Sequence, residues 1–398
     1  MYHFDCVVIG GGVVGAATGT ALAETGRNVA ILEQFPMPHS RGSSMGRTRI
    51  TRLAYTDSNY VKMVVDSNER WMELQRWAGE TLFKNSGVLS VSQNAAELDA
   101  LNAAYADNAL KYERFTDRQL HAKYGKLFST APLHGGLHEP TGGLLLSAKC
   151  VLAYHRRFQS LGGQLFDDVR VARVDLDRPV IGQCSLVLGD GRTFTARHLF
   201  VTVGPWAPTF LREHFDLELP IESHQTITTF WRELDPGQYS ADRGTPGVLF
   251  GDDEDDHLRY FLKPTLEYPG YLQFGVHYGV QADPNQPATT WSDFVADYVA
   301  KCRRVAEKYK LNIDTAYPAV IEPCFYTECI DKDFILDRHP KHRNVIIGTG
   351  FTGHGFKHAP VIGRILASFV TGDKVPYNLD RFKISRFSKT STNSRSKL

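Results

Sequence analysis

Residues 4–33 read FDCVVIGGGVVGAATGTALAETGRNVAILE, and this stretch decides the fold. An apolar run with β-branched residues ends at Ile9, which is typical of a buried parallel strand. A glycine-rich turn follows, and the Ala- and Thr-rich segment from Ala16 to Glu24 then predicts a helix that Gly26 ends. A second apolar strand over residues 28–32 ends in Glu33. The stretch therefore predicts a strand–helix–strand unit, the basic element of an α/β fold.

The glycines of this turn have the spacing Gly10-x-Gly12-x-x-Gly15. The first allows the tight turn, the second lets the backbone approach a pyrophosphate, and the third lets helix and strand pack closely. Glu33 follows where an acid would accept a hydrogen bond from a ribose 2′-OH, and it would repel the 2′-phosphate of NADP. The pattern predicts dinucleotide binding and leaves FAD and NAD open. The neighbouring residues counted with this site are Val13, Val14 and Gln34.

Further strands and helices of the same kind recur along the chain. Apolar strands run into glycine over residues 198–204 and 344–348, and helices are predicted over 147–161 and 355–370. Pro360 indicates that the regular part of the last helix starts near that residue. Between these blocks, alternating strands mix with helical stretches. We therefore expect a discontinuous nucleotide domain (1–85, 145–220 and 321–386), a mixed α+β second domain (86–144 and 221–320) and a flexible tail (387–398).

Composition excludes several classes of protein. The chain has 45 basic and 44 acidic residues, and six of the basic ones lie in residues 381–398, which contain no acid. Removing these six charges from the net +1 leaves −5, so there is no basic field for a nucleic acid. The six cysteines include no C-x-x-C pair, which disfavours a zinc ribbon and a disulfide framework. The uncharged run 6–23 contains the glycine turn, so we expect no membrane span and no secretion signal.

Two other regions carry residues suited to chemistry. Four arginines among glycines and serines in residues 40–52 predict either a solvated loop or a loop that holds anions over the cofactor. Cys324 is either a buried apolar residue or a reactive one. Lys357 follows a glycine turn and is either a surface lysine or a ligand-binding one. His354 and His358 flank it without a third metal ligand, and the acidic run 252–256 lacks an EF-hand spacing, so no metal site is predicted.

Taken together, these motifs resemble the monomeric sarcosine oxidase family of covalent flavoproteins, and most of all its peroxisomal members. The resemblance runs from Phe4 to about Phe387. The stretches that carry it are 10–15, Leu32-Glu33-Gln34-Phe35, Pro38-His39-Ser40-Arg41-Gly42-Ser43-Ser44, Arg49-Ile50-x-Arg52, Glu267-Tyr268-Pro269-Gly270, Cys324-x-Tyr326-Thr327, 334–340 and Gly353-His354-Gly355-Phe356-Lys357.

The resemblance implies a fold and a set of roles. The fold is that of an FAD-dependent oxidoreductase of the glutathione-reductase-like type, with a mixed-sheet substrate domain. Cys324 would bond the 8α-methyl of the flavin, Arg49 would lie beside the isoalloxazine, and Arg52 with Lys357 would hold the substrate carboxylate. His277 matches a histidine that lines the substrate pocket. The remaining residues assigned to the cofactor by this resemblance are Ser43, Ser44, Met45 and Gly353, with Arg49 and Lys357 also close to it.

The implied activity is oxidation of a small secondary amino acid, such as sarcosine, L-pipecolate or L-proline, to the imine. The flavin takes two electrons and O₂ reoxidises it to give H₂O₂. Two alternatives stay open: a dehydrogenase of the same substrates with another electron acceptor, and a catalytically silent flavoprotein that binds a carboxylate. The family resemblance favours a monomer.

The chain departs from the family pattern at two positions. Gln273 stands where the family usually has a lysine near the flavin, and Met45 stands where it has a histidine. A fixed positive charge favours electron transfer to O₂, so Gln273 predicts slow reoxidation that limits turnover. Arg47 or Lys263 could compensate.

The sequence ends in Ser396-Lys397-Leu398. This tripeptide matches a peroxisomal address that an import receptor reads. An enzyme that forms peroxide also suits a compartment that contains catalase. We therefore expect a peroxisomal location, with the import receptor as a partner.

Overall fold

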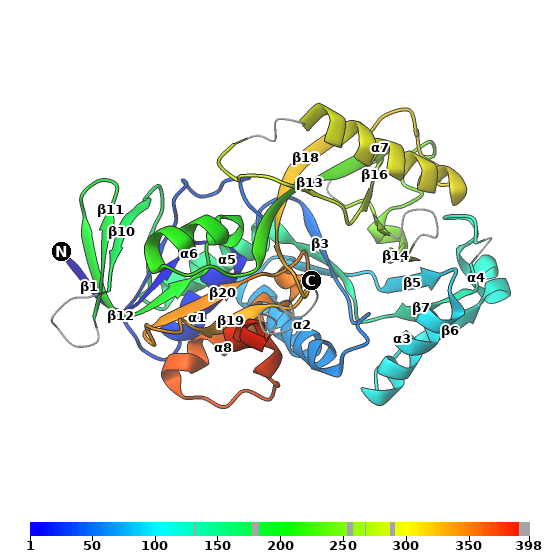
Figure 1. The fold of residues 1–398 in the computed structure, drawn as a ribbon. Helices are drawn as coiled ribbons and strands as arrows, with labels where there is room; N and C mark the ends of the chain where they lie inside the picture. Colours follow the sequence, from blue (N-terminus) through cyan, green and yellow to red (C-terminus); the bar gives the residue numbers. More distant parts are fainter. Residues whose placement is uncertain (131–132, 177–182, 253–257, 267, 287–290, 390–398) are drawn as a thin grey trace, which may run out of the picture.

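Two large β-sheets, one in each half of the molecule, organise the fold (Figure 1). The structure is a computed structural model, which describes residues 1–130, 133–176, 183–252, 258–266, 268–286 and 291–389. Within those ranges one sheet has eight strands and the other has nine. A small third sheet is formed by three strands that are distant in the sequence. Most of the acidic run 252–256, Glu267 and the tripeptide 396–398 lie outside the described residues.

The eight-stranded sheet is built around the predicted strand–helix–strand unit, which is confirmed. β1 pairs parallel with both β2 and β12, and Val7 and Val8 at its centre are fully buried. The other parallel pairs are β2 with β9 and β12 with β20. In spatial order the strands are β10 (Val171–Asp175), β11 (Cys184–Leu188), β12 (Thr193–Val201), β1 (Tyr2–Ile9), β2 (Val29–Leu32) and β9 (Gln164–Phe166), with β20 (Val345–Thr349) beside β12 and β19 (Ile335–Arg338) beside β20.

Apolar helices pack together beside this sheet. They are α1 (Val13–Ala23), α2 (Ser58–Ala78), α5 (Ser147–Ser160) and α8 (Gly355–Thr371). Helix α8 begins at Gly355, so the expectation of a start near Pro360 is wrong. The helix continues through the proline because tight packing fixes it: a Cβ on Gly363 would lie 2.6 Å from the backbone of Ala17 in α1. Such close packing outweighs the lost hydrogen bond at Pro360.

The nine-stranded sheet is mixed, as expected for the second half of the molecule. Only β14 and β5 pair parallel, and its other described pairs are antiparallel. The strands in order are β17 (Val280–Gln281), β13 (Ile221–Arg232), β16 (Tyr271–Val276), β15 (Arg259–Lys263), β14 (Gly247–Asp252), β5 (Val88–Ser92), β7 (Gly135–Glu139) and β6 (Glu113–Thr116), with β18 (Val320–Cys329) beside β13. The helices near it are α3 (Ala95–Asp107), α4 (Asp117–Tyr124) and α7 (Trp291–Lys308).

The remaining elements connect the two halves. The small sheet has the order β3 (Thr48–Thr51), β8 (Gly143–Leu146) and β4 (Phe83–Asn85). The short helices are η1 (Gly204–Trp206), α6 (Ala207–Phe215), η2 (Ala241–Arg243), η3 (Asp380–Phe382) and η4 (Ile384–Lys389). Strand β18 pairs with β13 along ten residues, although the sequence assigns residues 321–386 to the nucleotide domain. The expected domain boundaries stay a prediction.

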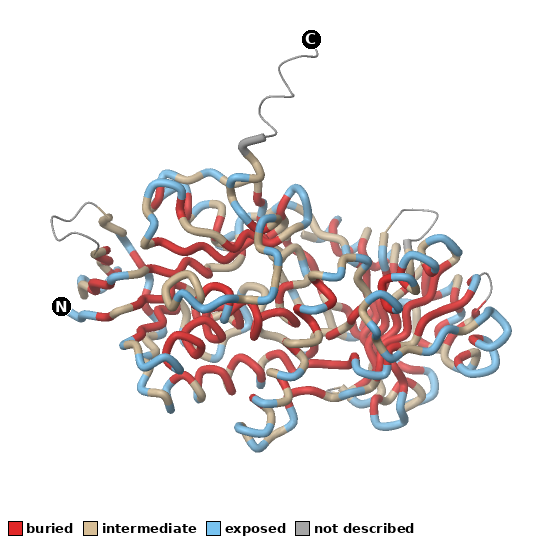
Figure 2. Tube along the Cα trace, turned by 90° about the horizontal axis from the view of Figure 1, so that it is seen from below, coloured by how far each residue is buried: buried red, intermediate tan, exposed pale blue. Residues whose placement is uncertain are grey.

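Buried residues gather in both halves of the molecule (Figure 2), and the two largest apolar clusters of the described residues lie one in each half. Trp71, Phe158 and Phe334 are fully buried among the helices of the first half. Trp231, Tyr298 and Phe274 are fully buried between the nine-stranded sheet and α7. The chain passes several times between the two halves. Ligands commonly bind in cavities at such boundaries.

Candidate active site

The first cavity begins at the glycine turn between β1 and α1. Gly10 has a φ of +100°, and a Cβ there would lie 2.5 Å from the carbonyl oxygen of Thr202. A Cβ on Gly15 would lie 1.8 Å from the oxygen of Gly10, so neither position tolerates a side chain. Helix α1 starts at Val13 without a side-chain cap. The turn therefore presents backbone N–H groups and the positive end of a helix to the cavity, as a pyrophosphate requires.

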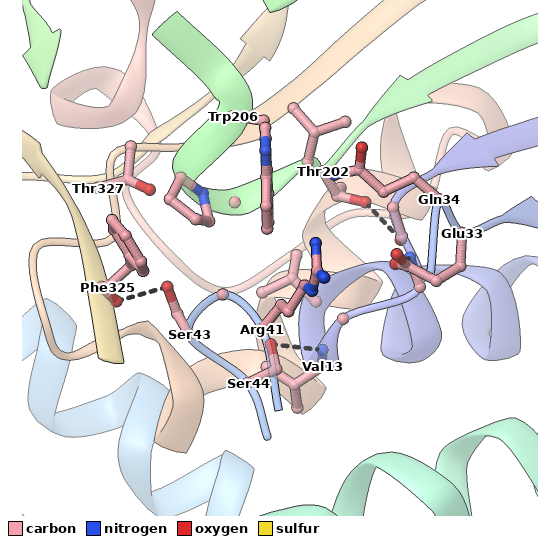
Figure 3. A pocket seen from close by; sticks show the side chains of 18 of the residues that line it. Val13, Glu33, Gln34, Arg41, Ser43, Ser44, Thr202, Trp206, Phe325 and Thr327 are labelled. Carbon is pink, nitrogen blue, oxygen red and sulfur yellow. Dashed lines mark hydrogen bonds between the residues drawn. The ribbon is translucent and has the colours of Figure 1, made fainter. Parts of the chain in front are cut away.

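Glu33 and the loop that carries Ser43 and Ser44, called the serine loop below, form two further walls of the first cavity (Figure 3). Glu33 is buried, and its carboxylate accepts hydrogen bonds from the N–H groups of Gly11 (2.8 Å) and Phe35 (3.0 Å). Ser44 Oγ accepts from Val13 N at 3.0 Å, and Ser43 Oγ donates to the Phe325 carbonyl oxygen at 2.6 Å. These contacts hold the loop across the mouth of the glycine turn.

Sequence reasoning missed two residues of this cavity, Arg41 as an individual residue and Trp206. Both side chains point into the space between the serine loop and Glu33 (Figure 3). Arg41 lies over the ring of Phe35 at 4.5 Å, and Trp206 donates to Asn285 Oδ1 at 2.8 Å. A cation and a flat aromatic ring beside a phosphate-binding turn suit a nucleotide. The available signal was Trp206 itself, which follows the strand end at Gly204-Pro205.

A second cavity, of about 660 Å³, adjoins the first. The residues that line both are Arg49, Cys324, Tyr326, Gly353 and Phe356. The two cavities therefore meet where Cys324 of β18 lies against the loop before α8. The volume of the second cavity is sufficient for a small amino acid and for a cyclic one.

Arg49 and Cys324 lie together at this meeting point. The Arg49 guanidinium donates to the carbonyl oxygens of Ser43 (3.1 Å), Met45 (3.0 Å) and Thr48 (2.9 Å). Its Nη2 lies 3.8 Å from Cys324 Sγ. Cys324 is partly exposed, whereas the other five cysteines, all in the described part of the chain, are buried. Cys324 is thus the cysteine that a ligand in either cavity can reach.

Arg52 and Lys357 line the second cavity from opposite ends of the sequence. The Arg52 guanidinium stacks on the ring of Tyr55 at 4.6 Å and donates to the carbonyl oxygen of Ala54. Lys357 is 5% exposed, and its Nζ donates to the Tyr55 hydroxyl at 3.0 Å and to the His354 carbonyl oxygen at 3.1 Å. Burial and the neighbouring Arg52 hold the pKa of Lys357 well below its usual range. An arginine and a lysine nitrogen beside one cavity are groups that can bind a carboxylate.

Glu139 supports the Arg52 segment from behind. Its carboxylate is 1% exposed and accepts from Leu53 N with both oxygens, at 2.8 and 2.7 Å. The Tyr105 hydroxyl donates to it at 2.9 Å. Burial raises the pKa of Glu139 to about 7, although these hydrogen bonds and the nearby Arg52 act in the opposite direction. Sequence reasoning gave no sign of this residue.

Gln273 and Lys263 lie on the paired strands β16 and β15, and His277 follows the last residue of β16. His277 faces the second cavity and lies 3.4 Å from the Tyr326 hydroxyl. Desolvation by the surrounding protein, with smaller contributions from Arg52 and Lys357, lowers the pKa of His277 to about 3. Gln273 is buried outside the cavity lining and accepts from Thr48 Oγ1 at 3.2 Å. Lys263 pairs directly with Gln273, lines the cavity and donates to the Thr48 carbonyl oxygen at 3.0 Å.

The structure brings most of the predicted site residues together. Those lining the first cavity are Gly10, Gly12, Val13, Val14, Glu33, Gln34, Ser43, Ser44, Met45, Arg49, Cys324 and Gly353. Those lining the second are Arg49, Arg52, His277, Cys324, Gly353 and Lys357. Gly15 packs beneath the turn and Gln273 lies behind Thr48, so these two are near the cavities without lining them. Arg47, on the outer side, pairs with Glu322 at 3.3 Å.

No helix within the described ranges is long and apolar enough to cross a bilayer. In the same ranges, no three His, Cys, Asp or Glu side chains converge as metal ligands would.

Comparison with known proteins identifies a family whose cofactor suits this fold, the glycine turn and the acid at Glu33. A model of the FAD dependent oxidoreductase family matches residues 5–369, and the chain belongs to this family. It is 34% identical over 391 residues to peroxisomal sarcosine oxidase of Mus musculus, covering 98% of this chain and 97% of that one. It is 30% identical over 390 residues to monomeric sarcosine oxidase of Bacillus sp. (strain NS-129), covering 96% and 97%. Among solved structures, the open form of NikD, an amino acid oxidase essential for nikkomycin biosynthesis, superposes with a TM-score of 0.80 at 19% identity, covering 96% and 98%.

Proposed function

We propose that this protein oxidises secondary amino acids, such as sarcosine, L-pipecolate or L-proline, to the imine and passes the electrons to O₂, which becomes H₂O₂. One observation carries the proposal: Arg52 and Lys357 line the second cavity, which meets the first cavity at Arg49 and Cys324. A carboxylate held there lies next to the place where a flavin ring fits. The names of the mouse and Bacillus relatives agree with this activity.

FAD, when bound, supplies the two-electron acceptor for the C–H bond next to the substrate nitrogen. The chain's own residues bind and orient. Arg52 is held by Ala54 and Tyr55, so its guanidinium is fixed before the substrate arrives. With Lys357 it fixes the carboxylate, which sets the distance of the amine end from the flavin. His277 has a pKa of about 3 and therefore stays neutral in the cavity wall.

We further propose that Cys324 holds the flavin covalently through its Sγ. In support, Cys324 is the partly exposed cysteine, it lines both cavities, and Arg49 approaches its sulfur. The Cys324 thiol would hold the flavin at its 8α-methyl, and the flavin itself would supply the two-electron acceptor that forming this bond requires, with O₂ as the final oxidant.

A dehydrogenase that uses another acceptor is the second candidate, because Gln273 replaces the lysine that the family pattern leads us to expect. Lys263 favours oxygen as the acceptor, because it pairs with Gln273 across the two strands and brings a positive charge to the second cavity. The third candidate is a catalytically silent flavoprotein that binds a carboxylate. This candidate is disfavoured, because a protein that only binds a ligand has no need of a covalent bond to the flavin.

Anaerobic mixing of the purified holoprotein with sarcosine, L-pipecolate or L-proline separates these candidates. An oxidase loses its flavin absorbance with at least one substrate, and admission of air restores it with one H₂O₂ per turnover. Bleaching without rapid recovery in air identifies a dehydrogenase. If no amino acid bleaches the flavin, both enzymatic proposals are wrong.

A peroxisomal location is proposed as well. It is supported by the name of the mouse relative and by the tripeptide Ser396-Lys397-Leu398, which would bind the import receptor. A fluorescent fusion at the N-terminus should coincide with a peroxisomal marker. Deletion of the tripeptide should disperse it, and persistent puncta would reject this signal.

A further inference from the structure

The Tyr55 hydroxyl is the centre of a partly buried hydrogen-bond network in the wall of the second cavity. Lys357 Nζ lies 3.0 Å from it, His354 Nδ1 lies 3.1 Å from it, and His358 Nε2 lies 3.3 Å from it. A hydroxyl has one proton to donate and two lone pairs that accept. Three partners therefore saturate it, and the direction of each hydrogen bond can be derived.

The direction follows from the backbone contact of His354. Its Nε2 lies 3.4 Å from the Lys332 carbonyl oxygen, which can only accept, so Nε2 carries a proton. Burial holds the pKa of His354 well below its usual range, so the ring is neutral and Nδ1 carries no proton. Tyr55 must then donate its only proton to His354 Nδ1. His358 Nε2 and Lys357 Nζ consequently both donate to the Tyr55 oxygen.

Both histidines are uncharged in this arrangement. His354 accepts at Nδ1, and His358 Nδ1 is a buried atom without a hydrogen-bond partner in the described part of the chain. A charged His358 would bury an unpaired N–H donor at that atom, which costs more than a bare lone pair. Burial, followed by the charge of Lys357, accordingly holds the pKa of His358 well below its usual range.

Lys357 donates to two neutral acceptors, the Tyr55 hydroxyl and the His354 carbonyl, and has no carboxylate within ion-pair distance in the described ranges. The Lys357 nitrogen has a third substituent position, either a third N–H bond or a lone pair, and this position is available to a ligand in the second cavity. Among its charged neighbours, Arg52 disfavours an ammonium at Lys357 more strongly than Glu139 favours it. The titratable and charged groups around it are Arg52, Tyr55, Glu139, His277, His354 and His358.

We propose that Lys357 is an uncharged amine before the substrate binds and that it takes the proton of the substrate's ammonium group. The inference rests on the proposed function and assigns the proton acceptor for that reaction. In the step, the substrate N–H bond breaks, a Lys357 N–H bond forms, and no electron leaves either group. The products are a neutral secondary amine, which can be oxidised, and a charged Lys357, which can hold the carboxylate.

The geometry of an α-amino acid permits this sequence at one nitrogen. Its amine and carboxylate are attached to the same carbon, so a single lysine nitrogen can reach both groups in turn. Arg52 is charged throughout and supplies the first attraction for the carboxylate. The ion pair with Lys357 then forms only when a substrate has delivered its proton.

Two ligands of the same shape test the inference on the complete holoprotein. Pivalate and 2-aminoisobutyrate differ only in a methyl against an ammonium group, and neither has a C–H bond that the flavin could oxidise next to nitrogen. Calorimetric titrations at pH 8 in two buffers of different ionisation enthalpy give the protons exchanged on binding. We expect about one proton to be taken up with pivalate and about none with 2-aminoisobutyrate, whose own proton moves to Lys357.

Two variants identify the group that takes the proton. Lys357→Arg carries a permanent charge and should bind pivalate without proton uptake. Lys332→Arg is the matched control, because Lys332 lines the same cavity but pairs with Glu328, and it should leave the uptake unchanged.

The outcomes separate this inference from the proposed function. If pivalate binds without uptake and 2-aminoisobutyrate releases about one proton, Lys357 is already charged and the inference is overturned while the carboxylate site stands. Uptake that persists in Lys357→Arg assigns the proton to another group and also overturns it. If neither ligand binds, the carboxylate site itself is wrong, and with it the proposed function.

Discussion

Replacing Glu139 by glutamine removes a buried titratable group from behind the Arg52 segment and should change how stability depends on pH. The folded protein raises the pKa of this carboxyl from 4.5 to about 7. A raised pKa means that the folded state holds the proton more tightly than the unfolded chain. The stability it contributes is therefore complete below pH 4.5 and is lost as the pH rises through 7.

The size of the effect follows from the shift. The shift from 4.5 to about 7 corresponds to roughly 3 to 4 kcal/mol, at about 1.4 kcal/mol per pKa unit. Between pH 5 and pH 8 the unmodified protein should lose most of this, roughly 2 to 3 kcal/mol, relative to Glu139→Gln. Glu139 is 1% exposed, so solvent screening does not reduce the figure.

Urea unfolding of both proteins at pH 5, 6, 7 and 8 measures the difference. The free energy of unfolding of the unmodified protein should fall toward high pH more steeply than that of Glu139→Gln. Glu69→Gln, at an exposed position on α2, is the control and should follow the unmodified protein. Parallel pH profiles for the unmodified protein and Glu139→Gln would refute the assignment of a raised pKa to this group.

Three further predictions concern the site. Arg52→Met should lower kcat/KM by one to two decades, because a lost charge-assisted hydrogen bond is worth roughly 1.5–3 kcal/mol, and a methyl ester should be a poor substrate; equal turnover of ester and acid would remove Arg52 from this role. Cys324→Ala should release its flavin on acid denaturation, whereas the unmodified protein should retain it; full release from both would reject the covalent bond. Lys263→Met should slow reoxidation by O₂ on the order of tenfold and change anaerobic reduction less. Stopped-flow measurement checks this together with Gln273→Lys, which should accelerate only reoxidation; unchanged reoxidation in both would exclude a role for charge here.

The strand–helix–strand unit could be predicted because its determinants are local. The glycine turn, the helix and the acid at Glu33 all lie within residues 4–33, although α1 begins at Val13, three residues before the predicted Ala16. The roles of Arg52, Lys357 and Cys324 came from family resemblance, since nothing in their immediate sequence separates a ligand-binding residue from a solvated one.

The network around Tyr55 could not be predicted. Tyr55 is separated from His354 by 299 residues and from Lys357 by 302, and Glu139 is separated from Leu53 by 86. Such contacts depend on how two sheets are brought together. Similarly, β18 belongs to the nine-stranded sheet, where Cys324 is in register with Thr226 of β13, and short-range sequence patterns do not contain this pairing.

The ten-residue pairing of β18 with β13 has a consequence for how the protein keeps its cofactor. The glycine turn and Cys324 belong to different sheets, so a dinucleotide bonded to Cys324 as proposed would have to reach from one sheet to the other to bind at Gly10. Attachment at one end makes binding at the other intramolecular, governed by an effective concentration that dilution cannot lower. Local opening of either sheet would then be followed by recapture of the same molecule. Retention of the cofactor would be set by the length of the tether and not by the supply of free FAD in the surrounding solution.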